Sequence, residues 1–164
     1  MPAARLILDE LKKGDVTHVV GLPDNGSRAL YELIGNDPAL RIVSVCREGE
    51  AYAVASGLYV GGARPCVLIQ NTGFLESGDA FRGTAYNMAI PLVSLIGYRG
   101  YVSITPNSAR VDTAASFLEP TLRAWGMPYY TLASDVDVPV ISAAFREAEE
   151  GSKPVAVLIV GECM

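Results

Sequence analysis

The chain has 164 residues and a net charge of −5 at pH 7; half of its residues are hydrophobic and 19% are charged. This length and composition predict one compact domain with its own core and exclude a disordered chain. Acidic and basic residues are interspersed without a basic stripe, so nucleic acid is not an expected partner.

Neither a membrane nor an oxidising compartment is indicated. No apolar run reaches the roughly 18–20 residues that span a bilayer, and residues 1–10 form a charged amphipathic segment, not a secretion signal. The three cysteines are an odd number and include no CxxC pair, so no disulfide framework or cysteine-rich metal site is expected. A reducing cytoplasm is the predicted location.

Short apolar runs alternate with longer amphipathic segments along the chain. The short, β-branched runs predict buried strands at 17–21, 41–45, 66–70, 92–97 and 155–160, with a weaker one at 128–132. The amphipathic segments predict helices near 3–13, 26–35, 48–60, 76–89, 113–125 and 136–150. This alternation predicts a single doubly wound α/β domain over residues 1–164, with about six mostly parallel strands and helices on both faces. The segment 97–112 lacks periodicity and is expected to form a mobile surface loop.

Ligands of such sheets gather at the carboxyl ends of the strands. This rule selects three loops, 22–27, 46–50 and 71–78, all rich in polar or small residues. We therefore expect the three loops to form one polar rim.

The second of these loops carries an acidic residue at a predicted helix start. Glu48 is favoured there by the exposed backbone N–H groups, and the simplest interpretation is a structural helix-start carboxylate. The helix that follows is rich in small residues, and Ala51, Ala55 and Leu58 share one face at helical spacing. That helix is therefore predicted to pack against a partner chain.

Three segments together resemble a known family. Glu48, Ala51, Ala55 and Gly57 resemble the E-x-x-A-x-x-x-A-x-G pattern of the pyrimidine-binding (Pyr) domain of thiamine-diphosphate-dependent decarboxylases. The first-strand segment 19–23 is similar to the V-F-G-x-P of that domain, and 70–73 is similar to the Q-N-S-G loop of sulfopyruvate and phosphonopyruvate decarboxylases. The resemblance covers roughly residues 5–160.

The resemblance implies a cofactor and a partner. Sulfopyruvate decarboxylases are commonly split into a Pyr subunit and a diphosphate-domain (beta) subunit, and the sequence lacks the G-D-G and N-N motifs with which the latter holds its metal. The implied cofactors are therefore thiamine diphosphate and Mg²⁺, with the metal held by the partner subunit and none by this chain. Self-association through Pyr domains is also implied.

In this family the conserved glutamate hydrogen-bonds N1′ of the cofactor's aminopyrimidine, and we expect Glu48 to be this catalytic, cofactor-binding group. A small 2-oxo acid, sulfopyruvate or phosphonopyruvate, is the implied substrate and decarboxylation the implied reaction. Further cofactor contacts are expected from the loops after the first and third strands: Pro23, Asn71, Thr72, Gly73 and Phe74.

Other polar residues are candidates for the substrate, each with a structural alternative. Asp24 and Asn25 lie in the first loop, although Pro-Asp-Asn-Gly is also a strong turn sequence. A sulfonate or phosphonate calls for arginine, and Arg82 is the candidate chosen, with Arg47 and Arg99 also near the predicted rim. His18 opens the first strand, at the end away from the rim, and is expected to be structural.

Other functions remain open at this stage. A carboligase subunit for another 2-oxo acid and a non-catalytic Pyr-like regulatory module both fit the same motifs. A stand-alone nucleotide-binding domain fits the fold class, but the sequence has no G-x-G-x-x-G or P-loop fingerprint to support it.

Overall fold

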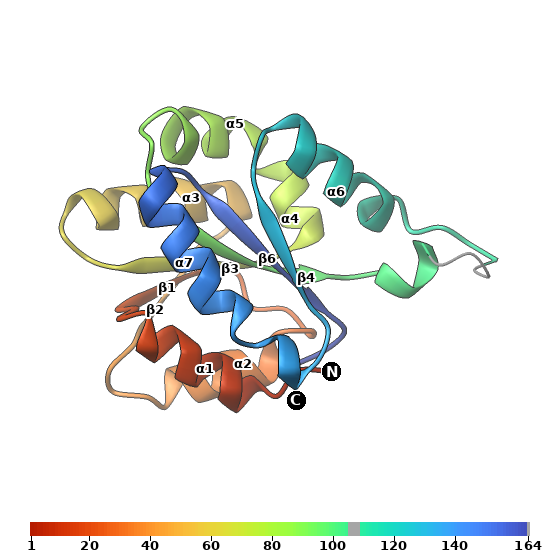
Figure 1. Cartoon of the computed structure of the whole chain (residues 1–164), viewed down its shortest axis with the longest axis horizontal. Helices are drawn as coiled ribbons and strands as arrows, with labels where there is room; N and C mark the ends of the chain where they lie inside the picture. The colour runs from red at the N-terminus through yellow and green to blue at the C-terminus, as the bar shows by residue number, and fades with distance from the viewer. Residues whose placement is uncertain (105–108, 164) are drawn as a thin grey trace.

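A computed structural model describes residues 1–104 and 109–163 as a six-stranded, all-parallel sheet with helices on both faces (Figure 1). The strand order is β2-β1-β3-β4-β6-β5. The strands are β1 His18–Gly21, β2 Arg41–Ser44, β3 Pro65–Gln70, β4 Val93–Tyr98, β5 Tyr129–Leu132 and β6 Val155–Val160.

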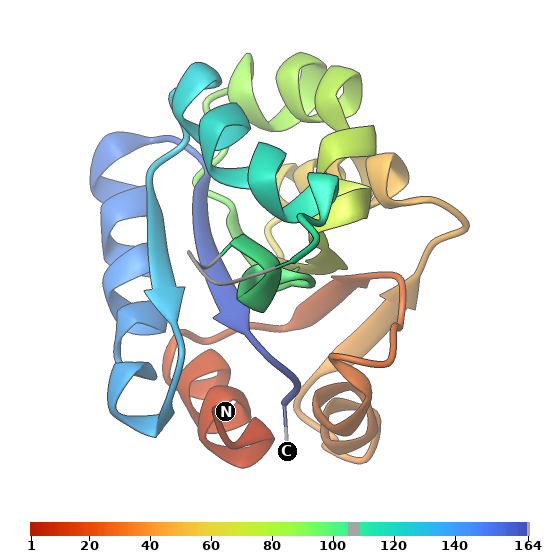
Figure 2. The same ribbon diagram turned by 90° about the vertical axis from the view of Figure 1, so that its right-hand side faces the viewer.

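The helices form two layers, one on each side of the sheet (Figures 1 and 2). One layer consists of α1 Ala4–Lys13, α2 Arg28–Gly35 and α7 Val140–Gly151. The other consists of α3 Glu48–Val60, α4 Asn71–Glu76, α5 Gly78–Ala80, the π-helix η1 Phe81–Tyr86 and α6 Thr113–Ala124. Two 3₁₀ turns, η2 Tyr101–Ile104 and η3 Asp135–Asp137, complete the described elements.

The strand sequences explain the position of each strand in the sheet. The first five residues of both β3 and β6 are buried, as their unbroken apolar runs predict for strands covered on both faces. Edge strand β2 has no fully buried residue. Because the chain steps from β1 outward to β2 and then returns to β3 on the other side of β1, the topological switch point lies between β1 and β3. A ligand crevice is expected above this point, at the carboxyl ends of the strands.

The α/β class, the six strands and their parallel arrangement are confirmed, but the predicted start of the fourth helical segment is wrong. The predicted loop 71–78 is mostly helix, because α4 begins at Asn71 directly after β3, and the predicted helix 76–89 is its continuation through α5 and η1. In the predicted loop 97–112, β4 extends to Tyr98 and η2 follows it; residues 105–108 lie outside the described part of the chain.

The small residues of α3 serve this chain's own core. Ala51 and Ala55 are fully buried in this chain's own core, on the side of the sheet that α3 shares with α4 and α6. Their small size allows α3 to lie close to the sheet. Packing of α3 against a partner chain stays a prediction and would use its exposed side, which includes Ala53 and Gly57.

Candidate functional site

Glu48 is the first residue of α3, directly beyond the carboxyl end of β2. Its side chain is half-buried and makes no hydrogen bond or ion pair with any residue that the structure describes. The neighbouring backbone groups are satisfied by other carboxylates: the Cys46 N–H donates to Glu50 Oε2 at 2.9 Å. Glu48 is thus a carboxylate at a helix start, as the structural interpretation expects, but it does not cap α3, because its carboxylate accepts none of the free N–H groups of the first turn.

Gly73 in α4 provides the space that the Glu48 side chain occupies. A Cβ at position 73 would lie 2.2 Å from Glu48 Cγ and 2.4 Å from Glu48 Oε1, closer than real Cβ contacts come. The two residues that the sequence motifs placed in separate loops are therefore in contact. Any side chain at position 73 would displace the carboxylate.

Tyr31 of α2 lies beneath the switch point between β1 and β3. Its Oη donates to the Leu68 carbonyl at 2.8 Å, and a Cβ at Gly21 would lie 2.6 Å from the same Oη. Burial, reinforced by the negative charges of Asp24 and Glu48, raises the pKa of Tyr31 and keeps its hydroxyl neutral. Tyr31 was not selected from the sequence, where its position in an amphipathic helix resembles that of any core tyrosine.

The loop after β1 contains Pro23, Asp24 and Asn25, and it forms the turn that its sequence favours. Asp24 Oδ1 accepts the N–H groups of Gly26 at 2.6 Å and Ser27 at 3.1 Å, directly before α2. Asp24 Oδ2 is buried and has no hydrogen-bond partner among the described residues. Pro23 and Asn25 are exposed beside it.

The start of α4 is joined to the loop that follows β4. Asn71 is fully buried, and its Nδ2 donates to the carbonyl of Arg99 at 2.9 Å. Thr72 is half-buried, and its hydroxyl donates to Gln70 Oε1 at 3.0 Å. Asn71 therefore connects the neighbourhood of Glu48 with the residues beyond β4.

A large hollow opens at the carboxyl ends of β1, β3, β4 and β6. It encloses about 780 Å³, and its acidic or amide-bearing lining residues are Asp24, Asn25, Gln70 and Glu162. Arg99 contributes the only basic side chain among the described lining residues, and it also borders a second hollow beside Asp112. Its guanidinium makes one ion pair, at 3.5 Å from Asp112 Oδ2, and the Arg99 side chain is 56% exposed.

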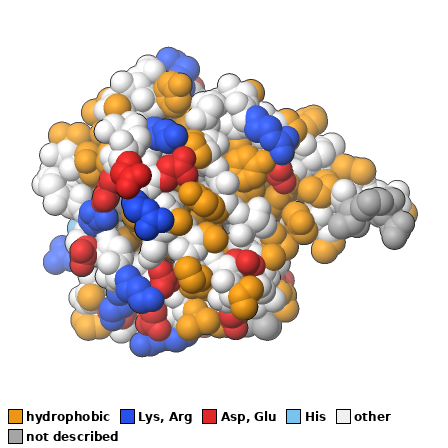
Figure 3. Space-filling view, viewed as in Figure 1, with side chains coloured by type: hydrophobic (Ala, Val, Ile, Leu, Met, Phe, Trp, Pro, Cys, Tyr) orange, Lys and Arg blue, Asp and Glu red, His pale blue; other side chains and the backbone are white. Residues whose placement is uncertain are grey.

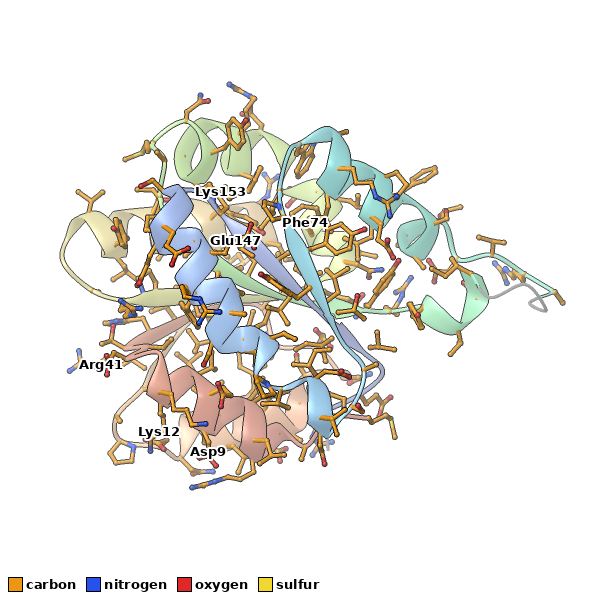
Figure 4. The ribbon with its side chains drawn as sticks, viewed as in Figure 1. Asp9, Lys12, Arg41, Phe74, Glu147 and Lys153 are labelled. Carbon is orange, nitrogen blue, oxygen red and sulfur yellow. The ribbon has the colours of Figure 1, made fainter. Side chains whose placement is uncertain are left out.

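Two predicted site residues lie away from this edge. Phe74 is fully buried between α4 and α6, where its ring centroid lies 5.0 Å from that of Trp125, so it is a core residue and does not reach the rim (Figure 4). Arg82 pairs with Asp79 at 2.7 Å and lines a separate hollow with Trp125. Arg82 is predicted to lie near the rim because the sequence places a loop at 71–78 before its helix. The helix instead begins at Asn71, so Arg82 lies farther along it and away from the rim.

Other predicted features have simple structural settings. His18 opens β1 at the amino edge of the sheet and contacts the Thr17 hydroxyl at 2.8 Å. Among the described residues, no group of three or more His, Cys, Asp or Glu side chains is arranged to hold a metal ion, and no helix has the length and apolar character needed to cross a membrane. On the face shown in Figure 3, acidic and basic side chains are mixed.

Residues 1–110 match the family described as thiamine pyrophosphate enzyme, N-terminal TPP binding domain. The matched part contains Glu48, Gly73, the loop after β1 and the helix α4 that follows β3.

Individual relatives differ in how much of their length is matched. The chain is 26% identical to the sulfopyruvate decarboxylase subunit alpha of Methanococcus maripaludis over 97% of its own length and 95% of the relative's. It is 29% identical to the corresponding subunit of Methanothermobacter thermautotrophicus, over 55% of this chain and 54% of the relative. It is 35% identical to the phosphonopyruvate decarboxylase of Streptomyces viridochromogenes, over 52% of this chain but only 21% of the relative.

Proposed function

Because this chain belongs to the thiamine pyrophosphate enzymes through their N-terminal TPP binding domain, we propose that it is the Pyr subunit of a two-chain 2-oxo acid decarboxylase with Glu48 as its catalytic carboxylate. The observation that carries the proposal is the Glu48 side chain, half-buried against Gly73 at the strand-end edge and without a partner among the described residues. A carboxylate in this state suits a ligand that presents a ring nitrogen.

The residues around Glu48 fit the pyrimidine end of thiamine diphosphate. Glu48 would exchange a proton with N1′ of the aminopyrimidine, and Gly73 keeps the space for its carboxylate open. We propose Pro23, Thr72 and Asn71 as the further contributors to this end of the site, with Asn71 acting through the loop that it holds. When bound, the cofactor supplies the nucleophile and the electron sink for decarboxylation.

The diphosphate and its Mg²⁺ are proposed to be held by a second, diphosphate-domain subunit. The support is the name of the relatives, sulfopyruvate decarboxylase subunit alpha, which implies a second subunit. Self-association of the Pyr subunits is part of the same proposal. A reducing cytoplasm suits the three free thiols.

The proposed substrate is sulfopyruvate or phosphonopyruvate, the acids in the names of the relatives. Both acids carry a second anionic group, which a guanidinium binds well. Arg99 borders the hollow at the strand ends, whereas Arg82 lines a different one, so Arg99 replaces Arg82 as the proposed anchor. Asp24 and Asn25, which line the same hollow, remain proposed contacts.

The experiment is carbon dioxide release by this chain co-expressed with a diphosphate-domain partner, in the presence of thiamine diphosphate and Mg²⁺. Glu48→Gln is expected to lower turnover by about 10²–10⁴-fold, the range of a lost acid–base group. Glu50→Gln is the matched control, because the Glu50 carboxylate already accepts the Cys46 N–H and an amide oxygen can replace it.

The outcomes separate the alternatives. Unchanged turnover in Glu48→Gln would remove the assignment. Cofactor binding without carbon dioxide release from any acid would favour a carboligase, and a complex that binds no cofactor would favour a non-catalytic module.

A further inference from the structure

The start of α3 lacks the residue that usually caps a helix. The N-cap position is Arg47, whose guanidinium has only donors and cannot accept the free N–H groups of the first turn. One of these groups, the N–H of Gly49, instead donates to Glu76 Oε2 at 3.1 Å. The cap is thus supplied by another helix.

Glu76 holds this helix start at two points. While Oε2 accepts the Gly49 N–H, Oε1 pairs with the Arg47 guanidinium. Arg47 and Gly49 are the two residues that flank Glu48, so Glu76 binds the chain on both sides of the candidate catalytic residue, through the side chain of Arg47 and the backbone N–H of Gly49.

The residue that contacts the Glu48 side chain and the residue that binds its neighbours belong to the same short helix, α4. Gly73 and Glu76 stand three residues apart in α4; Gly73 admits the Glu48 side chain, and Glu76 binds the flanking residues. Because α4 begins directly after β3, its position is tied to the central sheet. The position of Glu48 is therefore set by contacts with α4 as well as by its own helix.

We infer that Glu76 is a positioning residue that fixes the direction of the Glu48 side chain and keeps its carboxylate free. This inference rests on the catalytic role proposed for Glu48. With the Gly49 N–H occupied, the helix start does not draw the Glu48 carboxylate back toward its own backbone. Without Glu76, the first turn would have an unpaired donor and a carboxylate beside it.

The first test measures the cap itself and needs no catalysis. Amide hydrogen exchange at Gly49, followed by NMR, should be about fivefold faster in Glu76→Ala, the factor that corresponds to a typical net hydrogen bond. Glu76→Gln should exchange nearly as the parent does, because its amide oxygen still accepts the N–H. Unchanged exchange in Glu76→Ala would overturn the inference whether or not the complex decarboxylates anything.

The second test asks whether Glu76 acts through Glu48. In the complex with the diphosphate-domain subunit, Glu76→Ala should lower kcat about tenfold with KM little changed, less than the roughly hundredfold cost of a 1 Å misplacement. Glu76→Gln should restore most of kcat. In the Glu48→Gln background, Glu76→Ala should have no further effect on the residual rate, because there is then no carboxylate to position.

A matched control is available on the opposite edge of the sheet. Glu149 forms an ion pair with Arg64 between two elements, as Glu76 does with Arg47, and its exposed fraction is 49% against 36% for Glu76. Glu149→Ala should leave kcat unchanged. Equal losses in both variants, or losses from Glu76→Ala and Glu48→Gln that multiply, would mean that Glu76 contributes only stability. Absence of carbon dioxide release in the parent complex would instead refute the proposed function. The hydrogen-exchange result at Gly49 would then still show whether Glu76 caps α3.

Discussion

The two halves of the strand-end edge hold their polar groups in different ways. Over β2, β1 and β3, Glu48 lies against the backbone of Gly73, with no room for a Cβ between them. Over β4 and β6, Arg99 borders a hollow of about 780 Å³ and has one ion pair, at 3.5 Å from Asp112. One half holds a carboxylate tightly against a neighbouring backbone, while the other leaves open space around an exposed arginine. We infer a division between a rigid reaction centre and an adaptable substrate pocket.

Among the variants that test this comparison, the largest effect is expected from closing the space beside Glu48. Gly73→Ala would place a methyl group 2.2 Å from Glu48 Cγ, and the displaced carboxylate should cost about a hundredfold in kcat. The fold should persist, because position 73 is helical and alanine favours a helix over glycine by about 1 kcal/mol.

The control for this prediction is a second helical glycine. Gly57→Ala in α3 meets nothing within 4 Å and should leave kcat unaltered. Steady-state kinetics of both variants measures the difference in kcat, and thermal unfolding shows whether each variant keeps the fold. A fully active Gly73→Ala complex would show that the tight contact has no functional role.

The adaptable side should respond in substrate affinity, not in chemistry. Arg99→Gln should raise KM for sulfopyruvate about tenfold, the lower end of what a lost charged hydrogen bond costs, and leave KM for pyruvate nearly unchanged. Arg82→Gln, which removes an arginine from a separate hollow, should change neither. Kinetics with both acids measures this, and equal losses for pyruvate and sulfopyruvate would contradict an anionic anchor at Arg99.

Loss of the hydrogen bond that joins the two halves, from Asn71 to the Arg99 carbonyl, should appear first as a lower stability of the fold. Asn71→Ala removes the donor that satisfies the carbonyl of Arg99 and should lower the free energy of unfolding by about 1–3 kcal/mol. It should also raise KM for sulfopyruvate, because the segment that carries Arg99 loses its anchor. Urea unfolding gives the first quantity, with the exposed Asn87→Ala as the control. A KM effect without any loss of stability would mean that Asn71 contacts the ligand directly.

The same contrast explains what the sequence could predict. The strands were identified because buried parallel strands are continuously apolar, and Glu48 was identified because its spacing to Ala51, Ala55 and Gly57 is local. The sequence assigns Gly73 to a loop because residues 71–78 follow a strand and are rich in polar or small residues, but Gly73 lies in a helix and contacts Glu48, a residue distant in the sequence. Phe74 and Arg82 were misplaced as a consequence, since both depend on where α4 begins.

Glu76 shows the limit of local patterns most clearly. In the sequence it is one of many exposed acidic residues in an amphipathic segment, with no spacing that connects it to Arg47 or Gly49. Only the packing of α4 beside α3 makes it the missing cap. Functional residues that act on another element's backbone leave no periodic or motif signal.

The smallest expected effect is the dependence of this cap on pH. The hydrogen bond from Arg47 holds the pKa of Glu76 below its ordinary value of 4.5, burial opposes this, and the Gly49 N–H reinforces it. A carboxyl group whose pKa is lower in the folded state stabilises the fold fully above its unfolded pKa, and the contribution disappears as the pH falls through the folded pKa. The difference in unfolding free energy between the parent and Glu76→Gln should therefore be constant from pH 7 to about pH 6 and shrink below about pH 4. It should stay below about 1 kcal/mol, because the pair is largely exposed. Urea titrations at pH 7, 5 and 3.5 measure it, and a difference that grows on acidification would show that the charge of Glu76 does not support the start of α3.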